Sequence, residues 1–370
     1  MGSVWKSRLA ITLFGQSHGP AVGVTVDGLP AGLAIDTDAL AAFLQRRAPG
    51  RFPWSTPRKE ADVPEFLSGL VDGKTCGAPL TAVIRNNDTR PADYNSMQDI
   101  PRPGHADYTA AVKHRGNADT SGGGHFSGRL TAALCIAGGV CLQILKRRGI
   151  AIGAHIASVG EVKDALFDPV NISEATLQSF QTMDIPVLQP RVAPSIIEEI
   201  GKAKRAGDSS GGIIECAAIG LPAGLGDPLF GGMENRIASL VFAVPAVKGI
   251  EFGAGFAAAA MRGSQHNDPF YADGGVVKTR SNHHGGILGG ITSGMPLIFR
   301  AVVKPTSSIP PPQESIHLST LESAVLKVRG RHDPCIVPRA VPCMEAVMAI
   351  AVYDAMLEST LESILENSFE

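Results

Sequence analysis

Residues 28–33 read Gly-Leu-Pro-Ala-Gly-Leu, and the same six residues return at positions 220–225. Each copy follows a Gly-x-Ser-x-Gly pattern, at 15–19 and at 207–211, with identical spacing. Further on, the segment 73–80 is echoed by the segment 290–297. Chance recurrence of common residues is the alternative, but conserved order and spacing favour a duplication. We therefore expect one domain over 1–370 with an internal pseudo-repeat at roughly 10–150 and 205–357, its halves packed around a pseudo-twofold axis.

Hydrophobic periodicity and end signals predict the main elements. Helices are expected at 36–47, 127–148 and 194–205, with a C-terminal one beginning at Pro342; strands are expected at 21–26, 80–84, 212–219 and 297–303. Strands and helices do not alternate regularly enough for a doubly wound parallel sheet. The expected fold class is α+β, with antiparallel strands covering a helical core. For 357–370 two interpretations stay open, an amphipathic contact helix or a frayed tail, and the tail is favoured.

Composition narrows the class of protein. The 370 residues carry a net charge of −2 and are 44% hydrophobic, which favours a globular protein and gives no case for nucleic acid or membrane partners. The apolar run 130–145 contains 16 residues, too few to span a bilayer, and predicts a buried helix. Six cysteines show neither a C-x-x-C pair nor metal-ligand spacing, so we expect buried thiols, no metal and a cytoplasmic location.

Histidines beside glycine or arginine indicate the chemistry. Of only ten histidines, His18, His105, the pair at 283–284 and the one at 332 lie in such turns. Glycine lets backbone N–H groups approach an anion, arginine matches phosphate and carboxylate, and histidine moves protons near neutral pH. A lone histidine is more often structural, but the combination favours acid/base chemistry on a phosphorylated, acidic small molecule.

Two segments are candidate phosphate sites. The glycine-rich stretch 121–129 leads into a long expected helix, whose free N–H groups, with Arg129, can hold a phosphate. Its alternative is a turn capped by Ser127. The stretch 304–308, Lys-Pro-Thr-Ser-Ser, follows an apolar strand and offers hydroxyls, backbone donors and a lysine to a phosphate or a flavin edge. Its alternative is an ordinary strand-to-loop transition.

Seven motifs in this chain resemble those of chorismate synthases, in the family's order and spacing from about Phe14 to Leu357. They are FGQSHG, RRAPG, TPRKEADVPEFLSG, RPGHADY, SNHHGGILGGITSG, KPTSSI and GRHDPC-x-x-x-RAVP. The resemblance implies a β-α-β sandwich with internal pseudo-symmetry, assembled as a homotetramer. It also implies conversion of 5-enolpyruvylshikimate 3-phosphate to chorismate by 1,4-elimination of phosphate, with reduced FMN required although there is no net redox change.

The resemblance also assigns roles. His18 would protonate the departing phosphate, His105 would hold a proton at the flavin edge, and Asp333 would help the flavin N5 accept the ring hydrogen. Ser17 and Ser127 would orient substrate and flavin, and Arg47, Arg129 and Arg331 would hold the substrate's carboxylates and phosphate. The FMN contacts would be His125, Phe126, Ser127, Pro245, Ala246, Gly289, Lys304, Pro305, Thr306, Ser307, Ser308 and Arg331.

The chain departs from the family pattern at a few positions. Gln16 replaces a glutamate, an arginine triplet is shortened to Arg46-Arg47, and the flavin loop has His125 and Phe126 for an arginine and a serine. The loss of one fixed positive charge predicts a changed affinity for the phosphate-bearing ligand, and not a different reaction.

Two other functions remain open: an FMN-dependent reductase that has lost the elimination, and a non-catalytic binder of phosphorylated metabolites. The source of reduced flavin is open too, either the protein's own reaction with NADPH or an external flavin reductase. The compact length favours the external partner.

Overall fold

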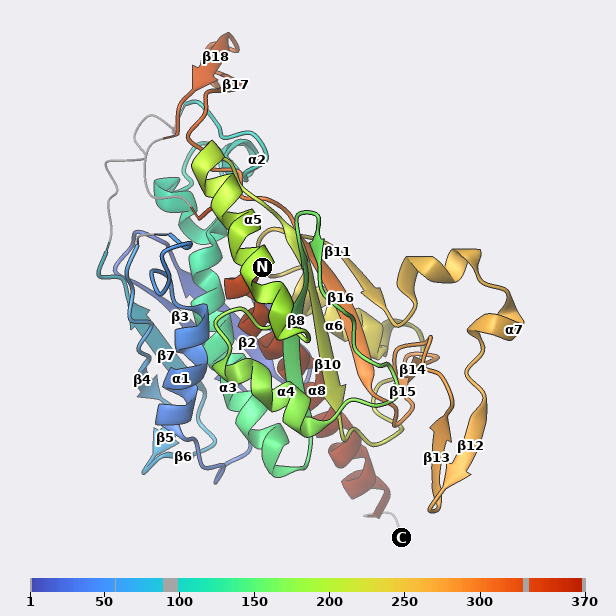
Figure 1. Ribbon diagram of the computed structural model, residues 1–370. Coiled ribbons are helices and arrows are strands. Elements are labelled where there is room, and N and C mark those ends of the chain that lie inside the picture. Colours follow the sequence, from blue (N-terminus) through green and yellow to red (C-terminus); the bar gives the residue numbers. More distant parts are fainter. Residues whose placement is uncertain (1, 57, 89–98, 329–332, 368–370) are drawn as a thin grey trace.

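The computed structural model describes residues 2–56, 58–88, 99–328 and 333–367, with backbone alone for 360–367. Two five-stranded antiparallel sheets enclose a helical layer (Figure 1). The first sheet has the order β1 (Val4–Lys6), β2 (Ala10–Gly15), β3 (Ala21–Asp27), β7 (Leu80–Arg85), β4 (Glu65–Ser68). The second has the order β9 (Val162–Lys163), β8 (Ala151–Val159), β10 (Gly212–Ile219), β16 (Leu297–Val303), β11 (Val247–Phe252). The expected α+β class is confirmed.

The helical layer is built from α1 (Thr37–Arg47), α3 (Thr131–Arg147), α6 (Met233–Val241) and α8 (Val337–Asn367). Helix α3 packs on β3 and β7, α8 packs on β8 and β10, and the two helices pack on each other. Both are rich in buried alanine, valine and isoleucine, which allows packing on a sheet on one side and on a helix on the other.

The remaining elements are short or peripheral. The helices are α2 (Asp107–Lys113), α4 (Glu174–Ser179), α5 (Ala193–Ala206) and α7 (Gly263–His266). The 3₁₀ turns are η2 (Ser121–Phe126), η3 (Gly128–Leu130), η4 (Phe180–Thr182), η5 (Pro190–Val192), η6 (Leu229–Gly231) and η7 (Gly255–Ala260). Four hairpins pair β5 (Leu70–Val71) with β6 (Lys74–Thr75), β12 (Phe270–Asp273) with β13 (Val276–Thr279), β14 (Ile287–Leu288) with β15 (Ile291–Thr292), and β17 (Gln313–Ile316) with β18 (Ser323–Leu326).

The two halves have the same order of elements. The succession β2-β3-α1-β7-α3 corresponds to β8-β10-α6-β16-α8, and β4 and β11 occupy equivalent edges, beside β7 and β16. Thr75 donates to the proline carbonyl of the first hexapeptide (2.6 Å) and accepts from its last leucine N–H (2.9 Å). Thr292 makes the equivalent bonds to the second hexapeptide, at 2.7 and 2.9 Å. The repeated sequence therefore belongs to a repeated hydrogen-bonded turn, and we propose that the second half begins at β8 and not near residue 205.

Two expectations about the C-terminal helix are wrong. Helix α8 begins at Val337, five residues before the expected start, and Pro342 lies inside it. Proline is common in the first turn of a helix, which is why the sequence predicts a start at Pro342. The N–H groups of Arg339 and Ala340 already bond to the carbonyl of Ile336, so the helix has begun before Pro342. The helix also continues to Asn367, where a frayed tail was favoured.

Two segments are long and apolar enough to cross a membrane by composition, Gly128–Arg147 and Val337–Ser359, and they contain α3 and most of α8. Within the protein 83% and 89% of these segments, respectively, are buried. The buried helix expected at 130–145 is therefore part of α3. The length and composition of the two segments are only weak evidence for a membrane-spanning helix.

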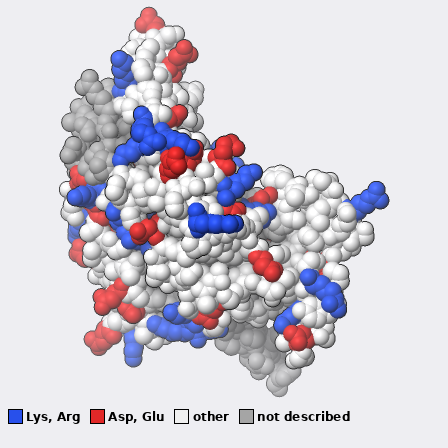
Figure 2. All heavy atoms as spheres, viewed as in Figure 1, with Lys and Arg blue, Asp and Glu red and all other residues white. Residues whose placement is uncertain are grey.

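An arm carrying α7, β12 and β13 projects from the second sheet (Figure 1). Figure 2 shows few charged groups on the upper part of its visible face, whereas basic and acidic groups lie on its lower part and over the rest of the molecule. Phe256 and Phe270, on η7 and β12, are exposed. Apolar side chains in this position are typical of a surface that other protein covers.

Candidate active site

A cavity with a volume of about 770 Å³ contains most of the predicted site residues. It lies where the first sheet, the glycine turn η2 and the loop after β16 meet. Eleven of the predicted site residues line it: His105, His125, Phe126, Ser127, Pro245, Ala246, Lys304, Thr306, Ser307, Ser308 and Asp333. These residues come from sequence positions 105 to 333, so the fold gathers segments that are distant along the chain.

A second cavity of about 220 Å³ adjoins the first. Four guanidinium groups line it, those of Arg47, Arg58, Arg129 and Arg339. Ser127, Gly128, Pro245, Asp333 and Ile336 line both cavities and form their common wall. We call the larger space the main cavity and the smaller one the arginine cavity.

The turn η2 brings the two predicted catalytic histidines to one loop. Gly122, Gly123 and Gly124 all have positive φ, a conformation that glycine adopts at little cost. A Cβ on Gly122 would lie 2.2 Å from the His18 ring, and one on Gly123 would lie 3.2 Å from Cε1 and Nε2 of His105. Consecutive glycines therefore allow both imidazoles to lie against the same backbone.

His105 is held by a carboxylate on the next helix. Its Nδ1 lies 2.6 Å from Oδ1 of Asp107, and Arg102 bonds both oxygens of that carboxylate at 2.7 and 2.8 Å. Burial would raise the pKa of Asp107, but the hydrogen bonds from Arg102 and His105 outweigh it and hold the pKa well below its usual range. The ionised carboxylate favours a proton on Nδ1, so Nε2 is the atom of His105 left for other chemistry.

Asp62 organises the arginine cavity. Its carboxylate pairs with Arg47 through one oxygen and with Arg129 through the other, and all three side chains are buried. Burial would raise the pKa of Asp62, but the two guanidinium groups lower it. Arg129 Nη2, 4.0 Å from Glu60, has no hydrogen-bond partner among the described residues. A buried donor of this kind is suited to an anionic ligand.

Arg58 continues this network toward the start of β3. It bonds Glu60 at 2.8 Å and Ser17 Oγ at 3.2 Å. Ser17 is itself buried, and its N–H donates to the carbonyl of Gly124 at 3.0 Å. Ser17 therefore joins the arginine network to the glycine turn, although it lines neither cavity.

Asp333 lies on the common wall and pairs with Arg339 at 2.6 Å. Burial raises the pKa of its carboxyl above the ordinary value, and the Arg339 charge only partly offsets this. Its Oδ1 has no hydrogen-bond partner within the described part of the chain. A carboxyl that protonates readily and has a vacant oxygen can exchange a proton with a bound molecule.

His125 is fixed by neutral partners. Its Nδ1 lies 2.8 Å from the carbonyl of Gly15, which can only accept, and its Nε2 lies 2.6 Å from Ser3 Oγ. Nδ1 therefore carries a proton, and both ring nitrogens are engaged by uncharged groups of the protein. Phe126 is part exposed beside His114, with ring centroids 6.1 Å apart.

The loop after β16 is anchored on three sides. Lys304 bonds Ser307 at 2.8 Å, and Ser307 donates to the carbonyl of Gly104 at 2.7 Å. Thr306 donates to the carbonyl of Asp333 at 3.0 Å, and Ser308 accepts from Arg102 at 3.1 Å. These bonds present the lysine and the hydroxyls to the main cavity.

Not every predicted residue is gathered here. Gly289 lies in the turn between β14 and β15 and does not line either cavity, and Pro305 bends the loop without lining it. His18 lines neither cavity, and its ring lies against Gly122 of the glycine turn. Arg331 lies outside the described residues.

Sequence reasoning missed Arg58, Arg102 and Arg339. All three lie inside the motifs TPRKEAD, RPGHADY and RAVP. The sequence does not show whether the arginine of such a motif faces a cavity. No group of three or more His, Cys, Asp or Glu residues in the described ranges is arranged to hold a metal ion.

Comparison with known proteins identifies the family. The family model described as "Chorismate synthase" matches residues 9–357. Chorismate synthase of Lancefieldella parvula is 46% identical over 367 residues, covering 96% of this chain and 96% of its own. The chain belongs to the chorismate synthase family. The family prediction is confirmed.

Other relatives agree. Chorismate synthase of Korarchaeum cryptofilum is 43% identical, covering 97% of this chain and 98% of its own, and that of Thermococcus kodakarensis is 45% identical, covering 94% and 96%. A crystal structure of chorismate synthase superposes with a TM-score of 0.74 at 27% identity, covering 95% of this chain and 92% of its own. Chorismate synthases are carbon–oxygen lyases, so the predicted enzyme class is confirmed, and the substrate is a small molecule.

Proposed function

We propose that this enzyme converts 5-enolpyruvylshikimate 3-phosphate to chorismate by 1,4-elimination of phosphate, with reduced FMN required, in the shikimate pathway to the aromatic amino acids. One observation carries the proposal: a cavity of flavin size shares a wall with a cavity lined by four arginines. That arrangement suits an aromatic cofactor beside a small polyanion.

The arginine cavity is suited to the substrate's charge. Four guanidinium groups face three nearby carboxylates, those of Glu60, Asp62 and Asp333, so positive charge is in excess before an anion binds. Arginine binds carboxylate and phosphate through paired donors, and the surrounding burial strengthens these bonds. The carboxylates hold Arg47 and Arg129 in position, and charge developing on the leaving phosphate is stabilised without reorganisation.

The main cavity is suited to FMN by volume and by donor set. Lys304, Thr306 and Ser307 offer a cation and hydroxyls, and Asp333 offers a vacant buried oxygen. Reduced FMN would supply the electron density that lets an unactivated ring hydrogen depart, which no side chain can supply. The flavin contacts proposed for Gly289, Pro305 and Arg331 rest on the family resemblance alone.

The two histidines have separate tasks. His18 is proposed to protonate the departing phosphate, which weakens the C–O bond to be broken. His105 is proposed to hold a proton at Nε2, because Asp107 engages Nδ1. Ser127 lies on the common wall, where it can orient both ligands. Asp333, with its raised pKa, is proposed to accept or return a proton at the same wall.

The departure at 125 has a local consequence. Both ring nitrogens of His125 are bonded within the protein, to Ser3 and Gly15, so neither is free to bind a phosphate in the main cavity. We expect FMN affinity to depend more heavily on Lys304, the cation that lines the cavity in the 304–308 loop.

The cellular setting is part of the proposal. We propose a cytoplasmic homotetramer that receives reduced FMN from an external flavin reductase, with NADPH as the ultimate reductant. The exposed Phe256 and Phe270 on the arm support assembly, because large apolar side chains exposed to water are costly.

An anaerobic phosphate-release assay tests the function. With dithionite-reduced FMN and 5-enolpyruvylshikimate 3-phosphate, the enzyme should release one phosphate per chorismate formed. His18→Ala and His105→Ala should each lower turnover by about 100-fold or more while FMN still binds, because each removes one proton-transfer group.

Other results would support other functions. Wild-type turnover in both histidine variants would remove the acid/base assignment. Tight binding of the substrate without phosphate release would indicate a metabolite binder. FMN binding without substrate binding would indicate a reductase.

A further inference from the structure

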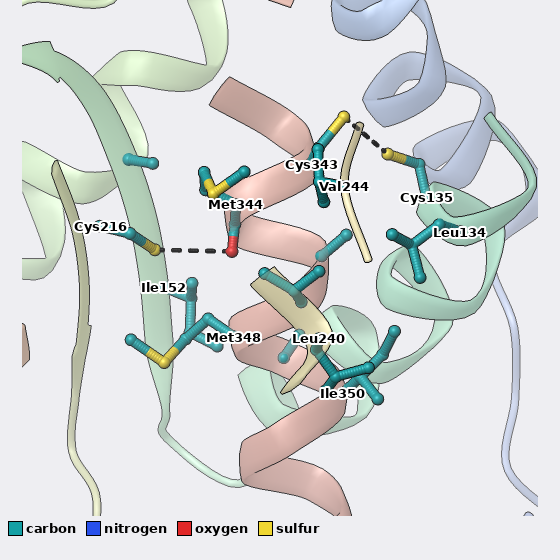
Figure 3. Packing of buried hydrophobic residues seen from close by; sticks show 14 of the residues in the cluster. Leu134, Cys135, Ile152, Cys216, Leu240, Val244, Cys343, Met344, Met348 and Ile350 are labelled. Atoms are coloured by element: carbon teal, nitrogen blue, oxygen red, sulfur yellow. Dashed lines mark hydrogen bonds between the residues drawn. The ribbon is translucent and has the colours of Figure 1, made fainter. Parts of the chain in front are cut away.

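Two cysteine thiols from different halves of the chain lie together beside the arginine cavity. Cys135 is on α3 and Cys343 is on α8, and their sulfur atoms are 3.8 Å apart (Figure 3). Cys343 lines the arginine cavity, whereas Cys135 is buried behind it. The cavity therefore gives small solutes a path to one of the two sulfurs.

The surroundings make Cys343 the reactive member. The thiol of Cys135 donates a hydrogen bond to the Cys343 sulfur, and this bond and the charges of Arg47 and Arg339 lower the pKa of Cys343 below the ordinary value. Burial opposes the shift but does not cancel it. Burial raises the pKa of Cys335 to about 12 and raises the pKa of Cys141 as well. Since the thiolate is the nucleophile, oxidation should select Cys343 among the buried cysteines.

The helices bring the pair close enough to be linked. One turn beyond the cysteines, a Cβ on Gly138 would lie 2.2 Å from that of Ala346, so the two helix backbones almost touch. Both contacts have the same offset along the chain, 135 with 343 and 138 with 346, so α3 and α8 run in the same direction here. A disulfide requires the sulfurs to approach from 3.8 Å to about 2.0 Å, a movement that side-chain rotation and small helix shifts can supply.

We propose that Cys135 and Cys343 form a peroxide-sensitive thiol pair, a reversible oxidation site on the wall of the arginine cavity. The Cys343 thiolate attacks hydrogen peroxide, the O–O bond breaks, hydroxide leaves and a sulfenic acid forms. The Cys135 sulfur then attacks that sulfur, and the S–O bond breaks to give a disulfide and a second hydroxide. The Cys135 proton and one from solvent convert the two hydroxides to water. Overall, two thiols lose two hydrogen atoms and one peroxide is reduced to two waters.

Oxidation of the two cysteines would alter the arginine cavity through Thr131. This residue accepts from Arg47 Nε at 3.1 Å, donates to the carbonyl of Gly128 at 2.6 Å, and lines the arginine cavity together with Cys343. A disulfide removes the Cys343 charge and draws its sulfur toward Cys135. The position of Arg47 then changes, and the oxidised enzyme should bind an anionic substrate more weakly until a dithiol reduces it.

The experiment uses the full-length Cys76→Ser protein, because Cys76 is exposed and could form disulfides between molecules. The protein is treated with hydrogen peroxide, quenched, denatured, alkylated and analysed by intact mass and by non-reducing peptide mapping. We expect a loss of two hydrogen atoms, one linked peptide pair that contains residues 135 and 343, and reversal by dithiothreitol. Thermal unfolding of the oxidised protein should shift upward, because the link closes a long loop.

Two variants in that background make the test specific. Cys135→Ala should stop at an oxygen adduct on Cys343, because no resolving thiol remains. Cys141→Ala is the matched control, another buried α3 thiol, and should form the link as the parent does. Free thiols at both positions after treatment that oxidises a model thiol would overturn the proposal, as would a link to any other cysteine. None of these readouts depends on turnover, so they stand or fall apart from the proposed function.

Discussion

At the scale of single residues, Gly122 decides whether His18 can reach the site. Its positive φ and its 2.2 Å approach to the imidazole leave no room for a side chain. By contrast, Gly128 on the common wall has negative φ, and a Cβ there would meet nothing within 4 Å. The two positions separate the effect of a methyl group near the site from the effect of displacing the histidine.

We expect Gly122→Ala to lower turnover by about 100-fold, because a displacement of about 1 Å in a catalytic group costs that much. Gly128→Ala should retain most of the activity. Steady-state phosphate release, with circular dichroism to show that both variants fold, is the measurement. Equal turnover in the two variants would show that the contact between Gly122 and His18 is unimportant.

The sequence predicted some of the site residues and missed others. Eleven predicted residues line one cavity; the family resemblance named most of them, and the histidine and hydroxyl clusters pointed to the others. Arg58 and Arg339 were missed because sequence does not show which arginine of a motif turns inward. Asp107 was missed as the partner of His105, since their contact depends on how α2 begins.

At the scale of elements, the crossing of α3 and α8 depends on Gly138. A Cβ there would lie 2.2 Å from Cβ and 2.4 Å from Cα of Ala346, so the helices would have to separate. Gly201 in α5 is the contrasting case, because a Cβ there would meet only the flexible end of Arg205, at 3.2 Å.

We expect Gly138→Ala to destabilise the fold by about 1–3 kcal/mol, the cost of overpacking a filled core. Gly201→Ala should be neutral or stabilise by up to about 1 kcal/mol, since alanine is the better helix former. Urea unfolding measures both. A stable Gly138→Ala protein would contradict the close helix crossing.

A buried histidine joins β8 to its neighbours. His155 lies 3.0 Å from Glu215 on β10 and 3.6 Å from Asp164, between the rings of Phe167 and Phe180. Burial would lower the pKa of His155, but the two carboxylates outweigh it and raise the pKa. The protonated imidazole therefore stabilises the folded state.

The sign of the pH dependence follows from this. A raised folded pKa gives stability that is fully present below the unfolded value of about 6.5 and is lost as pH rises through the folded pKa. The stability difference between wild type and His155→Gln should be about 3 kcal/mol near pH 6 and smaller in alkali. His317→Gln, which removes a half-exposed partner of Asp99, should change stability much less, because solvent screens that pair. A difference that grows with pH would contradict the raised pKa.

Most elements could be predicted because their patterns are local. The expected strand at 212–219 coincides with β10, and Asp36 caps α1 as its position suggests. The start of α8 could not be predicted, because a proline near a helix start and one inside it look alike in sequence. The role of β8 as the first strand of the second half was also hidden, since the sequence repeat begins only near residue 207.

At the scale of the whole molecule, the two halves share an order of elements but contribute different residues to the site. Both halves keep the threonine-anchored turn, yet the first half supplies His18, His105 and the glycine turn, while the second supplies the 304–308 loop and Asp333. The two cavities meet where these contributions join. The central claim is that cofactor and substrate lie side by side across this wall.

A crystal structure with both FMN and 5-enolpyruvylshikimate 3-phosphate bound tests that claim most directly. We predict the isoalloxazine in the main cavity, the substrate phosphate and carboxylates against Arg47 and Arg129, and the two rings in contact beside Ser127 and Asp333. Rings held apart by protein, or a substrate bound outside the arginine cavity, would contradict it.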